Sequence, residues 1–388
     1  MMERVSAAIY VLLGVAAFPF AYYLIAIFST WRYLRQAPQA ADAPVLPPVS
    51  NLKPIRGLDP GAYQNLASFC RQDYPEYELV LCVDADDDRV ASVIERLRSD
   101  FPQHQIRVLQ GSGRVATNDK VAKLARLVNE AEHEIVVISD SDVRVEPDYL
   151  RAVTAPLRDP AVGAVTCFYV PTEIDTFADH LHFAGMMSDF YAGILVAWQL
   201  DGVKFALGPT IVTTRTRLAG FGGYAAIENQ PADDLLVGRL IAEQGFRVEL
   251  LPYTIRTVSD YESMSDLLHK RLRWMVVMRH MRPSGHIGLV FTQGLAWCLI
   301  AIALHPRLIV AGAYLGTYIV LRSIMTWMIG AGILKQPFPW RQMLLIPLWD
   351  AAALGIWIAS FSRKSVRWRG ADYYIRNGQL IPVASANK

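Results

Sequence analysis

The chain has 388 residues, of which 53% are hydrophobic and only 19% are charged. That length suffices for one large domain or two smaller ones, and the composition is too apolar for an ordinary soluble protein. The formal net charge of +2 gives no reason to expect a nucleic-acid partner and none to exclude a membrane, because the positions of the basic residues matter more than their sum.

The first apolar block, residues 7–28, matches the roughly 20 residues that cross a bilayer. Arg32 and Arg35 follow it, which favours the cytoplasmic side for this flank. A cleaved signal peptide is the alternative, but the block is longer than the usual apolar core of one. We therefore expect a transmembrane anchor over residues 1–35, followed by an Ala- and Pro-rich linker over residues 36–50.

Beyond the linker, apolar strand patterns alternate with amphipathic helix patterns. This alternation is typical of βαβ units and predicts an α/β domain with a Rossmann-like, mostly parallel sheet over residues 51–262. The expected strands are residues 77–83, 105–109, 134–139, 162–170, 209–214 and 247–251. The expected helices are residues 61–71, 88–99, 118–131, 183–200, 233–244 and 263–282.

Three further apolar blocks, residues 287–304, 308–330 and 343–361, predict transmembrane or re-entrant helices over residues 287–362. Two of them contain a charge, Arg322 and Asp350. A lone charge inside a span costs about 2.5 to 3.5 kcal/mol, so these residues should pair or face a wet cavity, or else snorkel to the surface.

Basic residues flank the apolar blocks and bear on the topology. Those that precede the second block place the domain between the first two blocks in the cytosol. The basic tail, residues 363–388, also favours the cytosol. Four full spans would instead put this tail outside if the domain is cytosolic. One block is therefore predicted to be re-entrant or interfacial, unless the charge rule fails here. The four cysteines show no CxxC spacing and predict reduced, buried thiols.

Two acidic clusters follow apolar strands and are the first candidate site. Asp84 and Asp86 follow one strand, and Asp140 and Asp142 follow another. Ligands bind beyond the carboxyl ends of strands in open α/β sheets, and carboxylates there can hold Mg²⁺ or Mn²⁺ together with substrate phosphates. The alternative is that these residues only cap helices; two dense clusters favour the metal site.

Other polar positions add to this site. Asp233 and Asp234 begin a predicted helix; a helix cap accounts for one of them, and the second is a candidate general base for an alcohol nucleophile. Residues 111–116 fit a GxGxxA dinucleotide fingerprint, although they follow the wrong strand for a dehydrogenase. Lys120, just beyond, is a candidate contact for a phosphate or a base edge.

A basic amphipathic helix with the RW pair Arg273 and Trp274, over residues 263–286, closes the globular part. It is either a membrane-surface anchor, with Trp and Arg at the headgroup level, or a source of a guanidinium for a departing diphosphate. Both readings fit a lipid acceptor, because a site beside the bilayer suits one.

Taken together, these positions resemble the family-2-like GT-A glycosyltransferases, and most closely the ceramide glucosyltransferase group with its bacterial hopanoid-glycosylating relatives. The resemblance runs from the motif at residues 53–60, read as KPIRGLDP, to Trp274. By this resemblance Asp84 contacts the nucleotide, and Asp140 and Asp142 form the DxD-like site for metal and diphosphate.

The same resemblance assigns Asp234 as the base, and Arg273 with Trp274 as the end of a motif that binds diphosphate and shapes the acceptor site. Lys270 stands where the family has Gln or Arg, which keeps the charge but loses the bidentate fork. The implied reaction inverts the anomeric carbon in one displacement, with metal and Arg273 stabilising the departing UDP.

The sequence therefore predicts an integral protein of a bacterial inner membrane with a cytoplasmic catalytic domain. Its expected partners are a UDP-sugar, a lipid acceptor and the bilayer, and its expected function is transfer of a hexose, glucose first, to ceramide. The alternatives are transfer of N-acetylglucosamine or another sugar to a hopanoid lipid, a processive polysaccharide synthase, and a non-catalytic membrane scaffold.

Overall fold

A mixed eight-stranded sheet organises one of the two units into which the chain divides. The computed structural model describes residues 2–36, 46–84, 87–113, 116–259, 261, 263–337, 340–368, 371–376 and 378–383. The sheet unit comprises Ala37–Glu173, Asp201–Asp260 and Gly378–Lys388. The helical unit comprises Met1–Gln36, Ile174–Leu200 and Tyr261–Asn377.

The strand order of the sheet is β3-β2-β1-β4-β7-β6-β8-β5. Its strands are β1 (Val49–Pro54), β2 (Tyr77–Val83), β3 (Gln105–Gln110), β4 (Ile135–Ile138), β5 (Val143–Arg144), β6 (Val162–Pro171), β7 (Ile211–Thr214) and β8 (Arg247–Thr257). Strands β3, β2, β1 and β4 are parallel, and β7 and β5 pair antiparallel with their neighbours. The predicted α/β class and the six predicted strands are confirmed.

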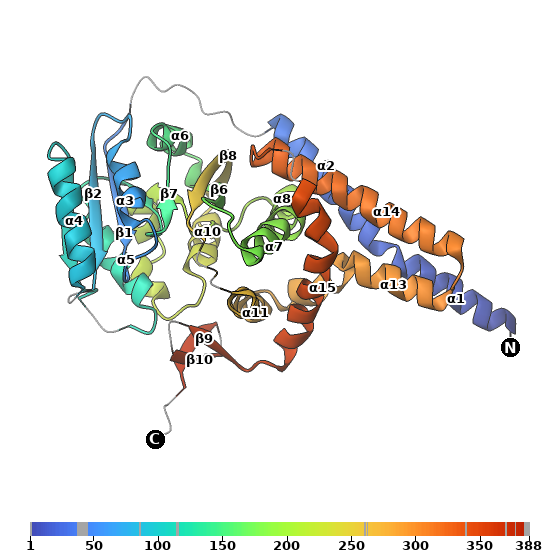
Figure 1. The fold of residues 1–388 in the computed structure, drawn as a ribbon. Coiled ribbons are helices and arrows are strands. Elements are labelled where there is room, and N and C mark those ends of the chain that lie inside the picture. The colour runs from blue at the N-terminus through green and yellow to red at the C-terminus, as the bar shows by residue number, and fades with distance from the viewer. Residues whose placement is uncertain are drawn as a thin grey trace. The chain divides into compact units, whose positions relative to one another are not determined.

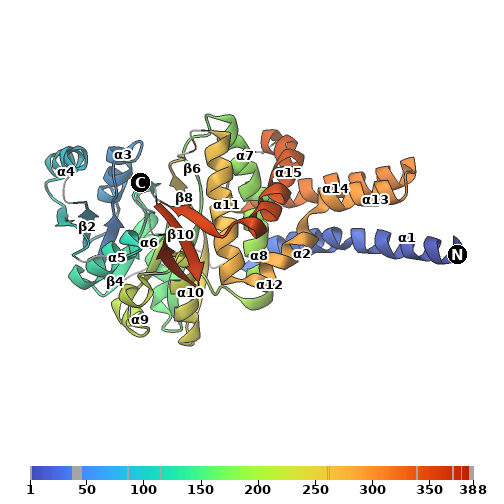
Figure 2. The same ribbon diagram turned by 90° about the horizontal axis from the view of Figure 1, so that it is seen from below.

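Helices lie on both faces of the parallel half of this sheet, with α3 and α4 on one side and α5 on the other (Figures 1 and 2). The helices of the unit are α3 (Ala62–Cys70), α4 (Asp88–Asp100), α5 (Asp119–Glu130), α6 (Tyr149–Thr154), α9 (Arg215–Ala219) and α10 (Asp233–Glu243), with short 3₁₀ turns η1 (Ala155–Arg158) and η3 (Tyr224–Ile227). Because both faces are covered, β1 is buried throughout and β2 is buried except at Tyr77, as expected of parallel strands.

Strand β1 is the central strand that the sequence pattern does not predict, because Ser50, Asn51 and Lys53 interrupt its apolar run. All six residues of the strand are nevertheless buried. It joins β2 on one side, with Pro54 opposite Cys82, and β4 on the other, with Leu52 opposite Ile138.

The helical unit is built from long apolar helices and one small hairpin. Its elements are α1 (Met2–Ala16), α2 (Phe18–Gln36), α7 (Phe177–Gly185), the π-helix η2 (Met186–Phe190), α8 (Tyr191–Asp201), α11 (Met264–Met281), α12 (Pro283–Gly288), η4 (Leu289–Thr292), α13 (Gly294–Leu304), α14 (Leu308–Trp327), the π-helix η5 (Met328–Ile333), α15 (Trp340–Ser362) and strands β9 (Ser365–Trp368) and β10 (Ala371–Arg376). Helix α14 packs on both α2 and α13. Figure 1 shows these three helices side by side with α1.

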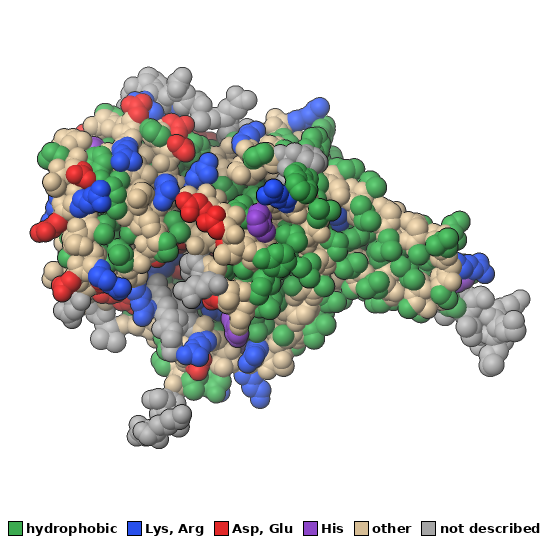
Figure 3. All heavy atoms as spheres, viewed as in Figure 1, with side chains coloured by type: hydrophobic (Ala, Val, Ile, Leu, Met, Phe, Trp, Pro, Cys, Tyr) green, Lys and Arg blue, Asp and Glu red, His purple; other side chains and the backbone are tan. Residues whose placement is uncertain are grey.

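Three helices in the described part of the chain are long and apolar enough to cross a membrane, namely Ile9–Gln36, Leu308–Ile333 and Trp340–Ser362. A fourth candidate, Pro283–Thr292 with Gly294–Leu304, is bent by 54°, as in a broken span or a re-entrant loop. Hydrophobic side chains cover the visible face of α13 and α14 (Figure 3). The predicted apolar helices at both ends of the chain are confirmed.

Arg322 and Asp350 pair with each other inside these helices, with side chains 5% and 7% exposed. Of the alternatives that the sequence left open, pairing is therefore the one observed, and snorkelling does not apply to these two residues. All four cysteines are buried free thiols, as predicted.

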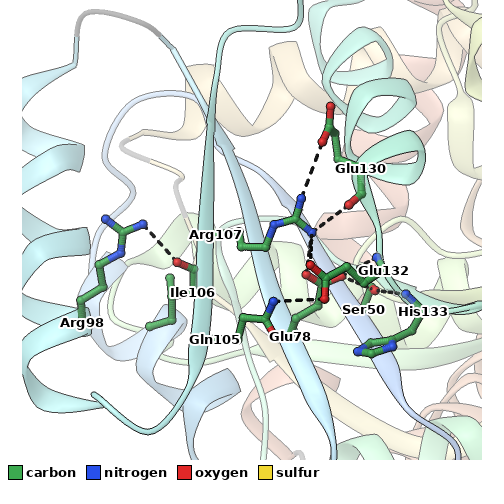
Figure 4. Close-up of polar contacts among 9 residues, drawn as sticks. All are labelled: Ser50, Glu78, Arg98, Gln105, Ile106, Arg107, Glu130, Glu132 and His133. Carbon is green, nitrogen blue, oxygen red and sulfur yellow. Dashed lines mark hydrogen bonds and ion pairs between the residues drawn. The ribbon is translucent and has the colours of Figure 1, made fainter.

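A buried glutamate clamps the amino-terminal edge of the sheet (Figure 4). Glu78 on β2 is fully buried and accepts hydrogen bonds from Ser50 Oγ on β1 at 2.5 Å, from the Glu132 amide at 2.8 Å and from Arg107 Nη1 on β3 at 2.9 Å. One carboxylate thus ties three strands to the turn before β4. The turn is held further by the amide of His133, which donates to Ser50 Oγ at 3.0 Å.

We expect Glu78→Gln to lower the free energy of unfolding of the sheet unit by about 2 kcal/mol, because it removes the charged acceptor of the hydrogen bonds from Ser50, Arg107 and the Glu132 amide. Denaturant unfolding in detergent measures the change. Gln105→Ala, which removes only an exposed bond of 3.1 Å to Glu132, is the control. Equal stability of both variants would contradict the clamp.

Candidate active site

The carboxyl ends of β1, β2 and β4 meet at one edge of the sheet because the three strands are parallel. Asp84 directly follows β2, and Asp140 comes two residues after the end of β4. The structure therefore brings the two predicted acidic clusters to the same edge. Asp86, also predicted to contact the nucleotide, lies outside the described residues.

Lys123 on α5 neutralises the first cluster. Its ammonium group, almost fully buried, contacts Asp84 Oδ1, lies 3.2 Å from Asp119 Oδ2 and donates to the Ile55 carbonyl at 2.8 Å. The Asp84 side chain remains 44% exposed. One edge of this carboxylate is thus fixed by the lysine while the rest is open to a ligand.

Lys120, one helical turn before Lys123, lies between two other carboxylates. Its Nζ is 2.7 Å from Asp140 Oδ1 and 3.4 Å from Asp233 Oδ2. Burial alone would lower the pKa of Lys120, but Asp140 and Asp233 outweigh it and hold that pKa above its usual range. The lysine is therefore a fixed positive charge beside the predicted metal ligand, where it can also meet a phosphate.

Lys53 on β1 lies beneath the second cluster. Its Nζ donates to Ser139 Oγ and to the Asp140 carbonyl, both at 2.9 Å, and lies 3.5 Å from the centre of the Phe69 ring. Burial lowers the pKa of Lys53 to about 7, although Asp142 and Asp140 favour its charged form. The residue holds the backbone of the Asp140 segment in place.

Asp234 faces Asp140 across a glycine. Its Oδ2 accepts from the Gly208 amide at 3.1 Å, and its Oδ1 accepts from the Leu235 amide at 2.8 Å. A Cβ on Gly208 would lie 3.2 Å from Asp234 Oδ2 and 3.6 Å from Asp140 Oδ2. Only glycine leaves this space open between the two carboxylates.

The environment of Asp234 suits a base. Burial, with the neighbouring Asp233 charge, raises the pKa of Asp234 to about 6. A carboxylate with a raised pKa is a better proton acceptor at neutral pH than an ordinary aspartate. Ala232 occupies the N-cap position of α10 and makes no side-chain cap bond. Neither Asp233 nor Asp234 is therefore the N-cap residue, the role that was the alternative to a catalytic one.

The donor set at this edge fits a hard divalent cation. No group of three or more His, Cys, Asp or Glu side chains in the described ranges is arranged to hold a metal by itself. Mg²⁺ needs only one or two protein carboxylates when substrate phosphates and water complete its shell. Asp140 lies beside the space at Gly208, and the role of Asp140 and Asp142 as metal ligands stays a prediction.

Arg273 and Trp274 lie on α11 in the helical unit, and their predicted contact with a diphosphate stays a prediction. Arg271 stacks its guanidinium over Trp274 at 4.9 Å and over Trp349 at 5.0 Å. Its Nη2 bonds His182 Nδ1 at 2.8 Å. Arg271 therefore packs inward and holds the indole of the RW pair in place.

Sequence reasoning did not single out Lys53, Lys123 or Gly208. Lys123 carried a signal, because it interrupts an apolar helix pattern that predicts burial, and a buried lysine needs a carboxylate. Lys53 carried no such signal, because the polar residues of β1 hide that strand from the pattern. Gly208 had none, because its role depends on two side chains, Asp140 and Asp234, far away in the chain.

Residues 11–381 match glycosyl transferase family 21. The chain belongs to this family. Ceramide glucosyltransferase 3 of Caenorhabditis elegans is 24% identical over 384 residues, covering 94% of this chain and 81% of the relative. Ceramide glucosyltransferase 1 of the same organism is 23% identical over 370 residues, covering 88% and 76%. The protein is thus an enzyme of glycosyl transfer, as predicted.

This family 21 glycosyltransferase is also similar to an N-acetylglucosaminyltransferase and to a mannosyltransferase of known structure. An N-acetylglucosaminyltransferase of Rhizobium meliloti is 25% identical over 324 residues, covering 80% of this chain and 72% of the relative. The mannosyltransferase PcManGT from Pyrobaculum calidifontis, solved with GDP-Man and Mn²⁺, superposes with a TM-score of 0.58 at 20% identity, covering 89% of this chain and 99% of that one. The likeness to PcManGT confirms the predicted GT-A fold.

We expect Asp234→Asn in this family 21 glycosyltransferase to lower kcat at least about a hundredfold, because the variant lacks a proton acceptor. In the wild type, kcat/KM should fall as the pH drops through about 6, where Asp234 takes up its proton. A pH–rate profile measures both effects. Unchanged turnover would remove Asp234 from the role of base.

The same variant tests the raised pKa through stability. When the pKa of a carboxyl group is higher in the folded than in the unfolded protein, the free energy of unfolding falls as the pH rises between the two pKa values. The pKa of an aspartate in the unfolded chain is about 4. Asp234→Asn should therefore gain stability relative to the wild type between pH 4 and about 6. A constant difference in melting temperature across that range would contradict the shift.

We expect Gly208→Ala to reduce turnover about tenfold or more, because its methyl group occupies the space between Asp140 and Asp234. The melting temperature should change little, since neither contact is a backbone clash. Gly288→Ala, where nothing lies within 4 Å, is the control. Wild-type kinetics in Gly208→Ala would show that the space is not used.

Proposed function

We propose that this family 21 glycosyltransferase transfers a hexose, with glucose as the first candidate, from a UDP-sugar to a hydroxyl group of a membrane lipid, with ceramide as the first candidate. The two ceramide glucosyltransferases that align with most of the chain support this choice. The observation that carries the reaction is Asp234, half-buried and facing Asp140 across Gly208.

In this proposal Asp234 takes the proton of the acceptor hydroxyl while its oxygen attacks the anomeric carbon, which inverts that carbon in a single displacement. Asp84 contacts the nucleotide. Asp140 and Asp142 hold Mg²⁺ or Mn²⁺, which when bound supplies positive charge to the diphosphate. The Mn²⁺ and GDP-Man in the structure of PcManGT support a divalent metal for this fold.

Further positive groups meet the charge that builds on the leaving diphosphate. Lys120 lies beside Asp140, so a diphosphate at that carboxylate would find its ammonium group within reach. Arg273 and Trp274 are assigned to the diphosphate and the acceptor by their family motif, and Asp86 to the nucleotide. Fixed charges that need no reorganisation are the usual source of stabilisation for such a transition state.

A second candidate is transfer of N-acetylglucosamine to a hopanoid lipid. The alignment of the Rhizobium meliloti N-acetylglucosaminyltransferase with most of the chain favours that sugar. In both proposals the sheet unit lies in the cytoplasm, at a bacterial inner membrane. Arg32 and Arg35, which follow the first span, support the cytoplasmic side.

The deciding experiment offers the detergent-purified enzyme UDP-glucose or UDP-N-acetylglucosamine, with ceramide, a hopanoid or a sugar primer, in Mg²⁺, Mn²⁺ or EDTA. We expect UDP release and a glycolipid product with glucose and ceramide in the presence of metal, and loss of both with EDTA. Asp234→Asn is the inactive control. Chain growth from the sugar primer without any glycolipid would establish a polysaccharide synthase instead.

A further inference from the structure

Helix α14 carries its polar side chains inward and its apolar side chains outward. Tyr318, Arg322 and Thr326 follow one another at intervals of four residues and are all buried. Ile319, Val320 and Ile324 on the other faces are 57%, 55% and 39% exposed. This is the reverse of a helix in water and is the polarity expected of a helix surrounded by lipid.

The buried stripe is anchored by an ion pair. Arg322 Nη2 contacts Asp350 Oδ1 on α15, and the Tyr318 hydroxyl donates to Asp350 Oδ2 at 2.8 Å. The carboxylate therefore has a partner on each oxygen. The pair is uncharged as a whole, which lowers its cost in an apolar setting.

The same guanidinium reaches a second element of the helical unit. Arg322 Nη1 donates to the Ser188 carbonyl in the π-helix η2. Its Cζ lies 5.1 Å from the centre of the Tyr23 ring on α2. One side chain thus joins α2, η2, α14 and α15, and π-helical turns of this kind occur frequently at functional sites.

Three polar atoms around this arginine have no hydrogen-bond partner among the described residues. They are Arg322 Nε, Ser188 Oγ and Thr326 Oγ1. Arg322 is 4% exposed, and Ser188 and Thr326 are fully buried. Buried polar groups nearly always have a hydrogen-bond partner, so a cluster without partners is expected to bind a polar ligand group.

The charges around the cluster restrict that ligand group. Burial raises the pKa of Asp189, the residue next to Ser188, and the charge of Arg322 partly offsets that rise. The guanidinium group therefore interacts with a second carboxyl group besides Asp350. An anionic group would meet two carboxyls here. The unpaired atoms are one N–H donor and two hydroxyls that donate or accept, which suits an uncharged hydroxyl or amide.

We propose that Ser188, Arg322 and Thr326 form a subsite for the uncharged polar group, an amide or a hydroxyl, of the lipid acceptor. Lipid is the ligand because the subsite lies between apolar helices whose outer faces are apolar. The proposal rests on the proposed function, which requires a lipid acceptor. It adds the residues that recognise that acceptor within the helical unit.

Thr326→Val and Ser188→Ala test the subsite because each removes an unpaired hydroxyl and little else. Each should raise the KM for ceramide in mixed micelles by about two- to tenfold, the loss of one hydrogen bond. The KM for UDP-glucose should stay unchanged. The unfolding midpoint should not fall. Thr317→Val, on the exposed face of α14, is the matched control and should have no effect.

A binding measurement makes the test independent of turnover. Ceramide in mixed micelles should raise the unfolding midpoint of the wild type and raise it less in the Ser188→Ala/Thr326→Val double variant. An equal rise in both, or an unchanged KM for ceramide in active variants, overturns the subsite while leaving the proposed function in place. Unchanged KM with a higher midpoint would show that the cluster holds only water.

Discussion

Buried lysines make the acidic edge of the sheet possible. Parallel strands bring Asp84 and Asp140 to one edge together with the Asp233–Asp234 pair. So many carboxylates would repel one another in a poorly hydrated site. Lys53, Lys120 and Lys123 each lie among them. Lys53 and Lys123 also donate hydrogen bonds to neighbouring backbone and hydroxyl groups.

This arrangement separates the carboxylates by task. Asp84 and Asp140 each have a lysine within ion-pair distance. Asp234 is held by backbone amides, and burial raises its pKa. The same edge of one sheet therefore holds carboxylates paired with lysines and, across Gly208, a carboxylate whose pKa is raised.

The helical unit applies the same rule in an apolar setting. Arg322 and Asp350 neutralise each other between α14 and α15, and their remaining contacts go to Tyr318 and to the Ser188 carbonyl. In both units a charge that leaves water is matched by an opposite charge and by hydrogen bonds, because an unmatched charge would be too costly to bury.

The sequence by itself determined the elements whose signal is local. Alternating apolar patterns located β2 and β3, long apolar runs located α2, α14 and α15, and strand-end aspartates identified the edge that carries the site. Strand β1 escaped this reasoning because its polar residues are buried by neighbours that the sequence order does not reveal. Only the tertiary structure decided which lysine meets which aspartate, that Gly208 separates Asp140 from Asp234, and that Arg322 pairs with Asp350. These are contacts between residues far apart in the chain, and packing rather than local pattern brings such residues together.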